Sequence, residues 1–496
     1  MRRTLPRAAL LASALLATQA GAQVGIPRTC PTVMDPAQRP VAGTTLTMAP
    51  ATYNIGNKQY TTNVYNGQFV APTLTMQPGQ RFAVTVVNNM RATNVQPEAQ
   101  IVRTNFHTHG LVVTPSPDSG DNVTNVSIPN NGGRHSLHFP VPAYHTTGMF
   151  WYHPHPHELT SSQVAGGLSG ALLVGSILKY FPQYQGVRER TLLIRDMLFS
   201  FSSPTLLNIN GSPCSAFPIA PGEQQLWHIG NFAANSFVNL KLQGQQWILL
   251  ALDGNPLAAP ERVDSLYLPP GSRAEVIVTG PAAGQRIGLV SAPVFPDTTS
   301  SVTPLGYILG SSARAARRAT RPSPAGLDAS VLDTLADLRH ATVVDRDTFT
   351  YSFVGNGAAV NGKIYAPNDP PVLIPYGRVQ EWTIINGTQF LHTFHIHQTD
   401  FLVMTVNGKP ANEGRLRDNI PIGVHRDASG NVVGDTVVIR FSFNPIAEGP
   451  FVFHCHVLQH EDEGMMMNVC VYNPADPNGR QKCNSYFSSA ATHAGH

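Results

Sequence analysis

A run of metal-binding side chains near the C-terminal end, from His454 to Met465, restricts what this chain can fold into more than any other feature. It places a cysteine between two histidines and follows them with another histidine and a methionine. Two imidazoles, a thiolate and a weak axial thioether are the ligands of a blue-copper electron-transfer site. Cys455, His460 and Met465 supply three of these ligands, so one imidazole must come from elsewhere in the chain.

The two histidines that flank the cysteine predict a second metal site. Successive side chains of a β-strand point to opposite faces. We expect a strand from Phe451 to Val457. Cys455 then faces one way while His454 and His456 face the other, so the sulfur and the two imidazoles serve different metals. Only a short piece of backbone would join the two sites, which suits electron transfer.

Three more clusters contain histidines separated by one residue, and they begin at His107, His153 and His392. An extended chain puts both imidazoles of such a pair on one face. In the third cluster, His392 is offset by an odd number of residues from His395 and His397. It is therefore predicted to point toward the site of the cysteine and to complete that site.

Eight histidines remain for the second site. They are His107, His109, His153, His155, His395, His397, His454 and His456. Imidazole binds copper, zinc, iron and nickel, so the ligand type alone does not identify this metal. A single pair could be a buried hydrogen-bonded pair or a polar turn, but four clusters in one chain favour a metal site.

The four clusters resemble the motifs of the multicopper oxidase family, which includes laccases, ascorbate oxidases, bilirubin oxidases and bacterial cuprous oxidases. The family motifs HxHG, HxH, HxxHxH and HCHxxxHxxxxM occur in this order at His107, His153, His392 and His454. The resemblance spans almost the whole mature chain. It implies an all-β fold of three consecutive cupredoxin-like Greek-key β-sandwich domains, with one type 1, one type 2 and two type 3 copper ions.

The resemblance also implies a set of ligands for each copper. The type 1 copper would be held by His392, Cys455 and His460, with Met465 as the axial ligand, and the type 2 copper by His107 and His395. The two type 3 coppers would be held by His109, His153 and His456, and by His155, His397 and His454.

Two carboxylates, Asp118 and Glu461, are similar to the proton-delivery groups of the family. Reduction of dioxygen to water consumes protons, so a carboxylate near the cluster would have a chemical task. Asp118 could instead make a hydrogen bond in a turn, and Glu461 could orient a ligand histidine. Thr393 and Gln398 stand where the family commonly has Pro and Gly, and we expect both near the type 1 copper.

The composition is typical of a turn-rich β protein. The chain has 496 residues, of which 13% are charged, with 42 Gly and 41 Pro. This length suggests about three domains, and the weakly charged, turn-rich composition favours β-sandwiches. The net charge of +3 comes without a Lys/Arg run long enough to indicate a nucleic-acid partner.

An internal repeat supports three related domains. Each copy begins with an Asn-Gly turn and ends in an alternating run, at Phe82 to Asn88, Gln225 to Asn231 and Val379 to Asn386. We predict domains at 23–182, 183–312 and 343–475, a linker at 313–342 and a C-terminal tail at 476–496. The middle domain has no histidine cluster, so the eight-histidine site is predicted where the first and third domains meet, with the middle domain as a spacer.

The N-terminal residues 1–22 are predicted to be a signal peptide, with three arginines before a short apolar stretch and an A-x-A-like cleavage site ahead of Gln23. The adjacent Arg2 and Arg3 leave twin-arginine export and ordinary secretion both open. We expect a periplasmic or secreted monomer that does not span a membrane. Four cysteines other than Cys455 predict disulfides, in any of three pairings, or free buried thiols.

The predicted function is that of an exported copper oxidase. Electrons from small reducing substrates, with phenols and aromatic amines first, would enter at the type 1 copper and reduce dioxygen to water at the trinuclear cluster. Oxidation of Cu(I) in copper tolerance is the alternative. Such oxidases often carry a methionine-rich insertion near the type 1 site, but Met404 is the only methionine between His397 and His454. A copper-free structural or cell-division factor would lack the ligands, and a two-domain nitrite reductase would need two repeats.

Overall fold

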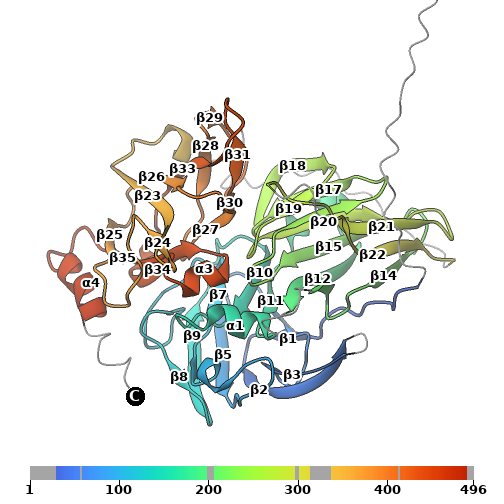
Figure 1. The fold of residues 1–496 in the computed structure, drawn as a ribbon, viewed down its shortest axis with the longest axis horizontal. Helices are drawn as coiled ribbons and strands as arrows, with labels where there is room; N and C mark the ends of the chain where they lie inside the picture. The colour runs from blue at the N-terminus through green and yellow to red at the C-terminus, as the bar shows by residue number, and fades with distance from the viewer. Residues whose placement is uncertain are drawn as a thin grey trace, which may run out of the picture.

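The computed structural model describes residues 29–55, 58–197, 206–296, 301–312, 337–411 and 414–488. The predicted signal peptide, most of the predicted linker and residues 489–496 lie outside this part of the chain. Nearly half of the described residues are in strands, which form three successive two-sheet units coloured blue to cyan, green to yellow, and orange to red in Figure 1. The last strand of the first unit ends at Val174 and the second unit begins at Arg188, and the second unit ends at Gly310 and the third begins at Asp345.

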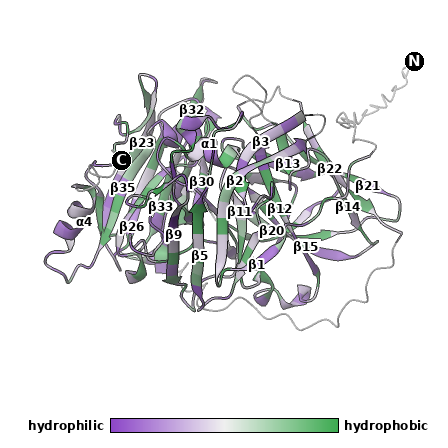
Figure 2. Ribbon diagram, turned by 90° about the horizontal axis from the view of Figure 1, so that it is seen from below, coloured by the Kyte–Doolittle hydropathy of each residue, from purple (hydrophilic) through white to green (hydrophobic). Residues whose placement is uncertain are grey.

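The first unit packs the sheet β3-β2-β5-β9 against the sheet β1-β4-β11-β10-β7. Buried and more exposed residues alternate along β5, and Figure 2 shows hydrophobic and hydrophilic residues on this strand. The alternation turns Phe82, Val84 and Val86 inward, where they share one core with Leu74 of the other sheet. The strands are β1 (Gln38–Pro40), β2 (Thr44–Ile55), β3 (Lys58–Tyr65), β4 (Thr73–Met76), β5 (Arg81–Asn88), β7 (His107–His109), β9 (Gly133–Pro140), β10 (Gly148–His153), β11 (Gly170–Val174) and the short pair β6 (Arg103–Thr104) and β8 (Ile128–Pro129).

The middle unit packs the sheet β13-β12-β15-β20-β17-β18 against the sheet β14-β22-β21-β16-β19. Trp227 of β15 and Phe217 of β14 meet across the two sheets, with ring centroids 4.8 Å apart. The strands are β12 (Arg188–Met197), β13 (Leu206–Ile209), β14 (Ser215–Ile219), β15 (Gln224–Asn231), β16 (Val238–Leu242), β17 (Trp247–Leu252), β18 (Asn255–Val263), β19 (Leu266–Leu268), β20 (Arg273–Thr279), β21 (Arg286–Ser291) and β22 (Thr303–Gly310).

The third unit packs the sheet β24-β23-β26-β33-β28-β29 against the sheet β25-β35-β34-β27-β30. Trp382 of β26 contacts Phe453 of β34 across its core, at a centroid distance of 5.2 Å. The strands are β23 (Asp345–Val354), β24 (Gly357–Val360), β25 (Val372–Pro375), β26 (Gln380–Asn386), β27 (His392–Ile396), β28 (Leu402–Val406), β29 (Lys409–Pro410), β30 (Asn419–Ile422), β33 (Thr436–Phe441), β34 (Gly449–Cys455), β35 (Met466–Tyr472) and the pair β31 (Val424–Arg426) and β32 (Val432–Gly434).

The repeated runs in the sequence form equivalent strands. β5, β15 and β26 each pair in parallel with an earlier strand, which is β2, β12 and β23 respectively. Each also pairs antiparallel with a later strand, which is β9, β20 and β33. The three units therefore share one strand arrangement, and each is a β-sandwich.

Helices are short and lie between or beside the sandwiches. Asp462, at the end of α3, accepts hydrogen bonds from the first N–H groups of α1, at Thr160 (3.0 Å) and Ser161 (2.8 Å), so α1 and α3 join the first and third sandwiches (Figure 1). The helices are α1 (Thr160–Ala165), α3 (Leu458–Asp462) and α4 (Gly479–Ser488), with 3₁₀ turns at Glu98–Gln100, Ile177–Lys179, Pro182–Tyr184 and Pro445–Ala447.

Two disulfides select one of the three possible pairings. Cys30 is bonded to Cys214, and Cys470 of β35 is bonded to Cys483 of α4. Residues 476–496 are predicted to be a tail, but α4 lies within them and the disulfide holds it against the third sandwich, where Phe487 is buried. None of the helices in the described part of the chain has the length and apolar character needed to cross a membrane.

Candidate metal centre

The cysteine lies in a pocket built within the third sandwich. Strands β27 and β34 pair antiparallel with Phe394 opposite Cys455, and α3 follows β34 directly. This brings the Sγ atom of Cys455 to 3.6 Å from Nδ1 of His392 and 3.7 Å from Nδ1 of His460. Met465 is buried in the same core, and its carbonyl accepts a hydrogen bond of 3.0 Å from the backbone N–H of Cys455.

The histidines beside Cys455 point away from this pocket, as strand alternation predicts. Nε2 of His454 lies 3.0 Å from Nε2 of His155 and 3.3 Å from Nε2 of His397. The ring of His456 lies 4.9 Å from that of His109. One covalent neighbour on each side of the cysteine therefore belongs to a second cluster of side chains.

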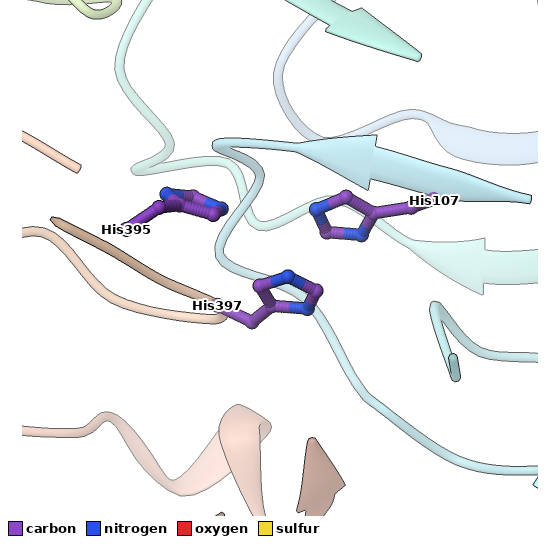
Figure 3. A group of neighbouring side chains, drawn as sticks. All are labelled: His107, His395 and His397. Atoms are coloured by element: carbon purple, nitrogen blue, oxygen red, sulfur yellow. The ribbon is translucent and has the colours of Figure 1, made fainter. Parts of the chain in front are cut away.

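The second cluster contains all eight remaining histidines and lies between the first and third sandwiches. The ring of His107, from β7, stacks on that of His397 with centroids 3.9 Å apart, and His109 stacks on His395 at 3.8 Å. Figure 3 shows His107 facing His395 and His397 from the opposite side of the cluster. Ligand atoms come within 4.8 Å of one another in three all-histidine groups, which are His107, His395 and His397; His107, His109 and His153; and His155, His397 and His454.

The free ring nitrogens fit a cluster of metal ions. Several buried nitrogens have no hydrogen-bond partner among the described residues: Nε2 of His107, His153 and His395, Nδ1 of His397, and both nitrogens of His109 and His456. Buried polar atoms are normally paired, so this concentration of unpaired nitrogens needs an explanation. Neutral imidazoles that converge without hydrogen-bond partners are suited to hold copper.

Burial keeps the imidazoles in the form that binds metal. Burial, and then the neighbouring histidines, hold the pKa values of His109, His395 and His397 well below the usual range. In the cysteine pocket, burial lowers the pKa of His392 to about 3 and that of His460 to about 4. A metal binds the neutral form of imidazole. These side chains are already neutral at pH 7, so they need not release a proton before they bind.

Hydrogen bonds on the far side of the rings fix their orientation. Nδ1 of His395 donates to the carbonyl of Asp418 at 2.7 Å, and Nδ1 of His153 donates to the carbonyl of Pro154 at 2.8 Å. In each case Nε2 is left to face the cluster. Outer partners of this kind set the tautomer of a ligand histidine.

Glu461 is a buried carboxylate at the cluster. Its oxygens lie 3.3 Å from Nδ1 of His155 and 3.4 Å from Nδ1 of His454, and it accepts a hydrogen bond of 2.9 Å from the Thr160 hydroxyl. Burial, followed by the charge of Asp462, raises the pKa of Glu461 well above its usual value. The side chain can therefore carry a proton beside the histidines.

Asp118 does not reach the histidines in the structure, whereas Asp121 does. Asp118 is exposed. Asp121 is buried, with its Oδ1 3.1 Å from Nδ1 of His107 and its Oδ2 3.2 Å from Nε2 of Gln398. The position of Asp121 soon after the HxHG motif was the only sequence signal for it, and the same signal applies to Asp118.

The two departures from the family pattern lie in different places. The backbone N–H of Thr393 points to Sγ of Cys455 at 3.5 Å, so this residue borders the cysteine pocket as expected. Gln398 was also expected there, but it contacts Asp121, on the histidine-cluster side. Gln398 has φ of 63°, a left-handed conformation that glycine adopts without strain, which explains why glycine is common at this position.

Sequence and structure comparisons agree on one family. Models of multicopper oxidases match residues 47–177, 151–289 and 333–475. A multicopper oxidase of Staphylococcus aureus is 25% identical over 428 residues, covering 82% of this chain and 83% of that protein. The laccase of Bacillus subtilis (strain 168) is 23% identical over 486 residues, covering 83% of this chain and 90% of its own. The solved structure of a multicopper oxidase from Campylobacter jejuni, described as a metallo-oxidase, has a TM-score of 0.71 at 23% identity, covering 91% of this chain and 98% of its own.

Three cupredoxin-like sandwiches that enclose a cysteine–histidine pocket and a histidine cluster define an oxidoreductase built to bind copper. The chain belongs to the multicopper oxidase family, as its four histidine motifs predicted.

Proposed function

We propose that this protein is a laccase-like oxidase, which takes single electrons from small phenols and aromatic amines and passes them to dioxygen in a four-electron reduction to water. The observation that carries the proposal is the position of Cys455. Its sulfur contacts His392 and His460, while its covalent neighbours His454 and His456 lie in the histidine cluster. Copper, when bound, supplies the one-electron redox chemistry and the site of dioxygen reduction.

The residues that would hold the ions follow from the donor sets. His392, Cys455, His460 and Met465 would hold the type 1 copper, and His107 and His395 the type 2 copper. His109, His153 and His456 would hold one type 3 copper, and His155, His397 and His454 the other. The last three supply ring nitrogens that lie within 4.8 Å of one another, which supports their assignment to one ion.

The chain itself supplies the route between the two sites. His460 is the partly exposed member of the cysteine pocket, so electrons from a substrate would enter beside its ring. From the Cys455 sulfur, the route continues through the backbone to His454, whose Nδ1 donates a hydrogen bond of 3.1 Å to the Cys455 carbonyl. Glu461 would hold a proton between His155 and His454, and Asp121, which contacts His107, would be the second carboxylate for proton delivery.

The surface beside the cysteine pocket favours aromatic substrates over Cu(I). The rings that border His460 and His392 include Phe353, at centroid distances of 5.4 Å and 6.0 Å. Phe353 is 39% exposed and contacts Phe390, which is 62% exposed, at 5.8 Å. Exposed aromatic faces bind other aromatic rings by stacking. Met404, the one soft ligand noted for Cu(I), packs instead with Leu338 and Leu402.

A spectroscopic experiment on the copper-loaded chain tests the proposal. The parent protein should show an intense blue absorption band from the thiolate–copper bond, and the Cys455→Ser variant should lose it. His107→Ala is the matched control, because it removes a cluster imidazole and leaves the cysteine pocket intact, so it should stay blue and lose oxygen consumption. A parent protein that binds copper and remains colourless would exclude the proposed function.

Steady-state oxygen uptake separates the two substrate classes. We expect a higher kcat/KM with a methoxyphenol than with Cu(I), and Phe353→Ala should lower the value for the phenol selectively. A higher kcat/KM for Cu(I), unaffected by Phe353→Ala, would support a metal oxidase instead.

Export belongs to the same proposal. Two disulfides support an oxidising compartment, periplasmic or extracellular. Mass spectrometry of the protein from its own host should find a mature chain that begins at Gln23, and a mature chain that still carries residues 1–22 would contradict export by this signal.

A further inference from the structure

One arginine of the middle sandwich lies beside the histidine cluster. Arg273 begins β20 and is fully buried where the three sandwiches meet. Its Nη1 and Nη2 atoms donate to the two carboxylate oxygens of Asp418, in the third sandwich, at 2.7 Å and 2.6 Å. Its Nε donates to the carbonyl of Met149, in the first sandwich, at 3.2 Å. A single guanidinium thus bonds to all three units.

Asp418, which Arg273 holds, also contacts two histidines of the cluster. Its Oδ1 lies 3.5 Å from Nε2 of His109, and its carbonyl accepts the hydrogen bond from Nδ1 of His395. The rings of His109 and His395 are the pair that stacks at 3.8 Å. One residue therefore borders an imidazole of the first sandwich and orients an imidazole of the third.

The space around this contact is closely filled. Gly110, the glycine of the HxHG motif, has φ of +88°, and a Cβ atom there would overlap both Asp418 Oδ2 and Arg273 Nη2. A Cβ atom on Gly271, in the middle sandwich, would approach Nε2 of His456 to 3.1 Å. The guanidinium and the carboxylate consequently have little freedom to move relative to the imidazoles.

Two neighbouring contacts also dock the middle sandwich. Arg417 Nε donates to Asp253 Oδ2 at 2.7 Å, and Asn419 Nδ2 donates to the carbonyl of Pro270 at 2.7 Å. The three consecutive residues from Arg417 to Asn419 therefore all bond to the middle sandwich, and Asp418 is the one that contacts both His109 and His395.

We propose that Arg273 is a positioning residue for the histidine cluster: it holds Asp418 so that His109 and His395 keep their metal-binding orientation only when the middle sandwich is docked. This inference rests on the proposed copper function. The alternative is that Arg273 only stabilises the docking of the sandwiches against one another. The two differ in what they predict for the cysteine pocket, because His392, Cys455 and His460 all belong to the third sandwich and serve as an internal reference.

The test compares Arg273→Lys with Arg417→Lys in the copper-loaded full chain. Lysine keeps the buried positive charge but loses the two-pronged contact, since its ammonium is a point charge. A chelator is titrated into each protein, and the type 2 electron paramagnetic resonance signal is followed together with the blue band. We expect Arg273→Lys to lose the type 2 signal at chelator concentrations about 10–100-fold lower than the parent, the range for outer partners of metal ligands. The blue band of Arg273→Lys should disappear at the same chelator concentration as in the parent. Both signals of Arg417→Lys should also match those of the parent.

Three results would overturn the inference. The first is that Arg273→Lys keeps the type 2 signal of the parent. The second is that both of its signals fall together, and the third is that Arg273→Lys and Arg417→Lys shift alike, since either would mean that Arg273 acts only in docking. If the histidine cluster of Arg273→Lys takes up no copper, circular dichroism and the blue band of its cysteine pocket decide between the two roles. A folded, blue protein without the type 2 signal supports positioning, and an unfolded protein rejects it. Failure of the proposed function is separate, because it would appear as a parent protein without a blue band.

Discussion

At the scale of single residues, a hydrogen bond sets the tautomer of one histidine in the cysteine pocket. The Thr388 hydroxyl lies 2.8 Å from Nε2 of His392 and 2.8 Å from Oδ1 of Asn386. A hydroxyl has one hydrogen to donate, and an amide oxygen can only accept. Thr388 therefore donates to Asn386 and accepts from His392, which leaves the lone pair of His392 on Nδ1, facing the sulfur of Cys455.

Removal of this acceptor should raise the reduction potential of the copper bound there. A hydrogen bond from the far nitrogen makes an imidazole a stronger donor, which favours the oxidised metal. Thr388→Val keeps the shape and loses the bond, which is worth about 1 kcal/mol, or on the order of 40 mV for one electron. Redox titration of the blue band measures the change. Thr388→Ser should retain the parent potential, and a Thr388→Val potential equal to the parent's would rule out this role.

At the scale of elements, one strand can serve two environments because its faces differ. On β27, Phe394 and Ile396 lie on the same face as His392 and join the core of the third sandwich. His395 and His397 lie on the other face, in the histidine cluster. A shift of one residue in the pairing of β27 with β34 would exchange the two faces. The apolar core on one side therefore also fixes which histidines reach the cysteine pocket and which reach the histidine cluster.

A buried charge links three strands of the middle sandwich. His228 of β15 lies 2.6 Å from Glu275 of β20 and 3.0 Å from Glu189 of β12. Burial alone would lower the pKa of His228, but the two carboxylates outweigh it and raise the pKa to about 9. The charged imidazolium is therefore the form that the folded protein prefers at neutral pH.

Stability should decrease as the pH rises through the alkaline range. The pKa of His228 is higher in the folded protein than its ordinary value of 6.5, so its contribution is complete below pH 6.5 and disappears as the pH passes about 9. The shift corresponds to on the order of 3 kcal/mol. Urea unfolding followed by tryptophan fluorescence at several pH values measures it. His228→Gln should flatten this dependence, and an equal slope in parent and variant would contradict the assignment.

At the scale of the whole molecule, the histidine cluster is an interface. His107, His109, His153 and His155 come from the first sandwich, and His395, His397, His454 and His456 come from the third. Six of these eight buried imidazoles carry ring nitrogens without a hydrogen-bond partner among the described residues, which is costly unless something binds them. Metal bound between the two sandwiches would therefore hold them together.

Removal of copper should lower the thermal stability of the whole chain. A ligand present at about 100 times its Kd stabilises the folded state by about 2.7 kcal/mol. Chelation should thus lower the Tm measured by scanning calorimetry by several degrees. The Cys455→Ser variant, which loses only the pocket within the third sandwich, should keep most of the copper-dependent rise. Equal Tm values with and without copper would mean that the cluster does not join the sandwiches.

Strand alternation allowed much of the candidate site to be predicted from the sequence. The side chains of His454, Cys455 and His456 point to alternate faces because of the covalent geometry of an extended chain, which does not depend on distant residues. The same rule assigned His392 to the cysteine and His395 and His397 to the cluster, and the structure places them there. The three repeated strands followed from local patterns of turns and apolar residues.

Contacts between distant segments were decided only by tertiary structure. Arg273 and Asp418 are 145 positions apart, and no pattern around either residue indicates that they meet. Asp121, rather than Asp118, contacts His107, and Gln398 lies at the cluster instead of the cysteine pocket, because the path of each loop depends on how the sandwiches dock. The sequence determined which side chains gather at the cysteine pocket and which at the histidine cluster, since local geometry separates their faces. Docking of the three sandwiches determined what surrounds those side chains, since burial and charge pairing exist only after distant surfaces meet.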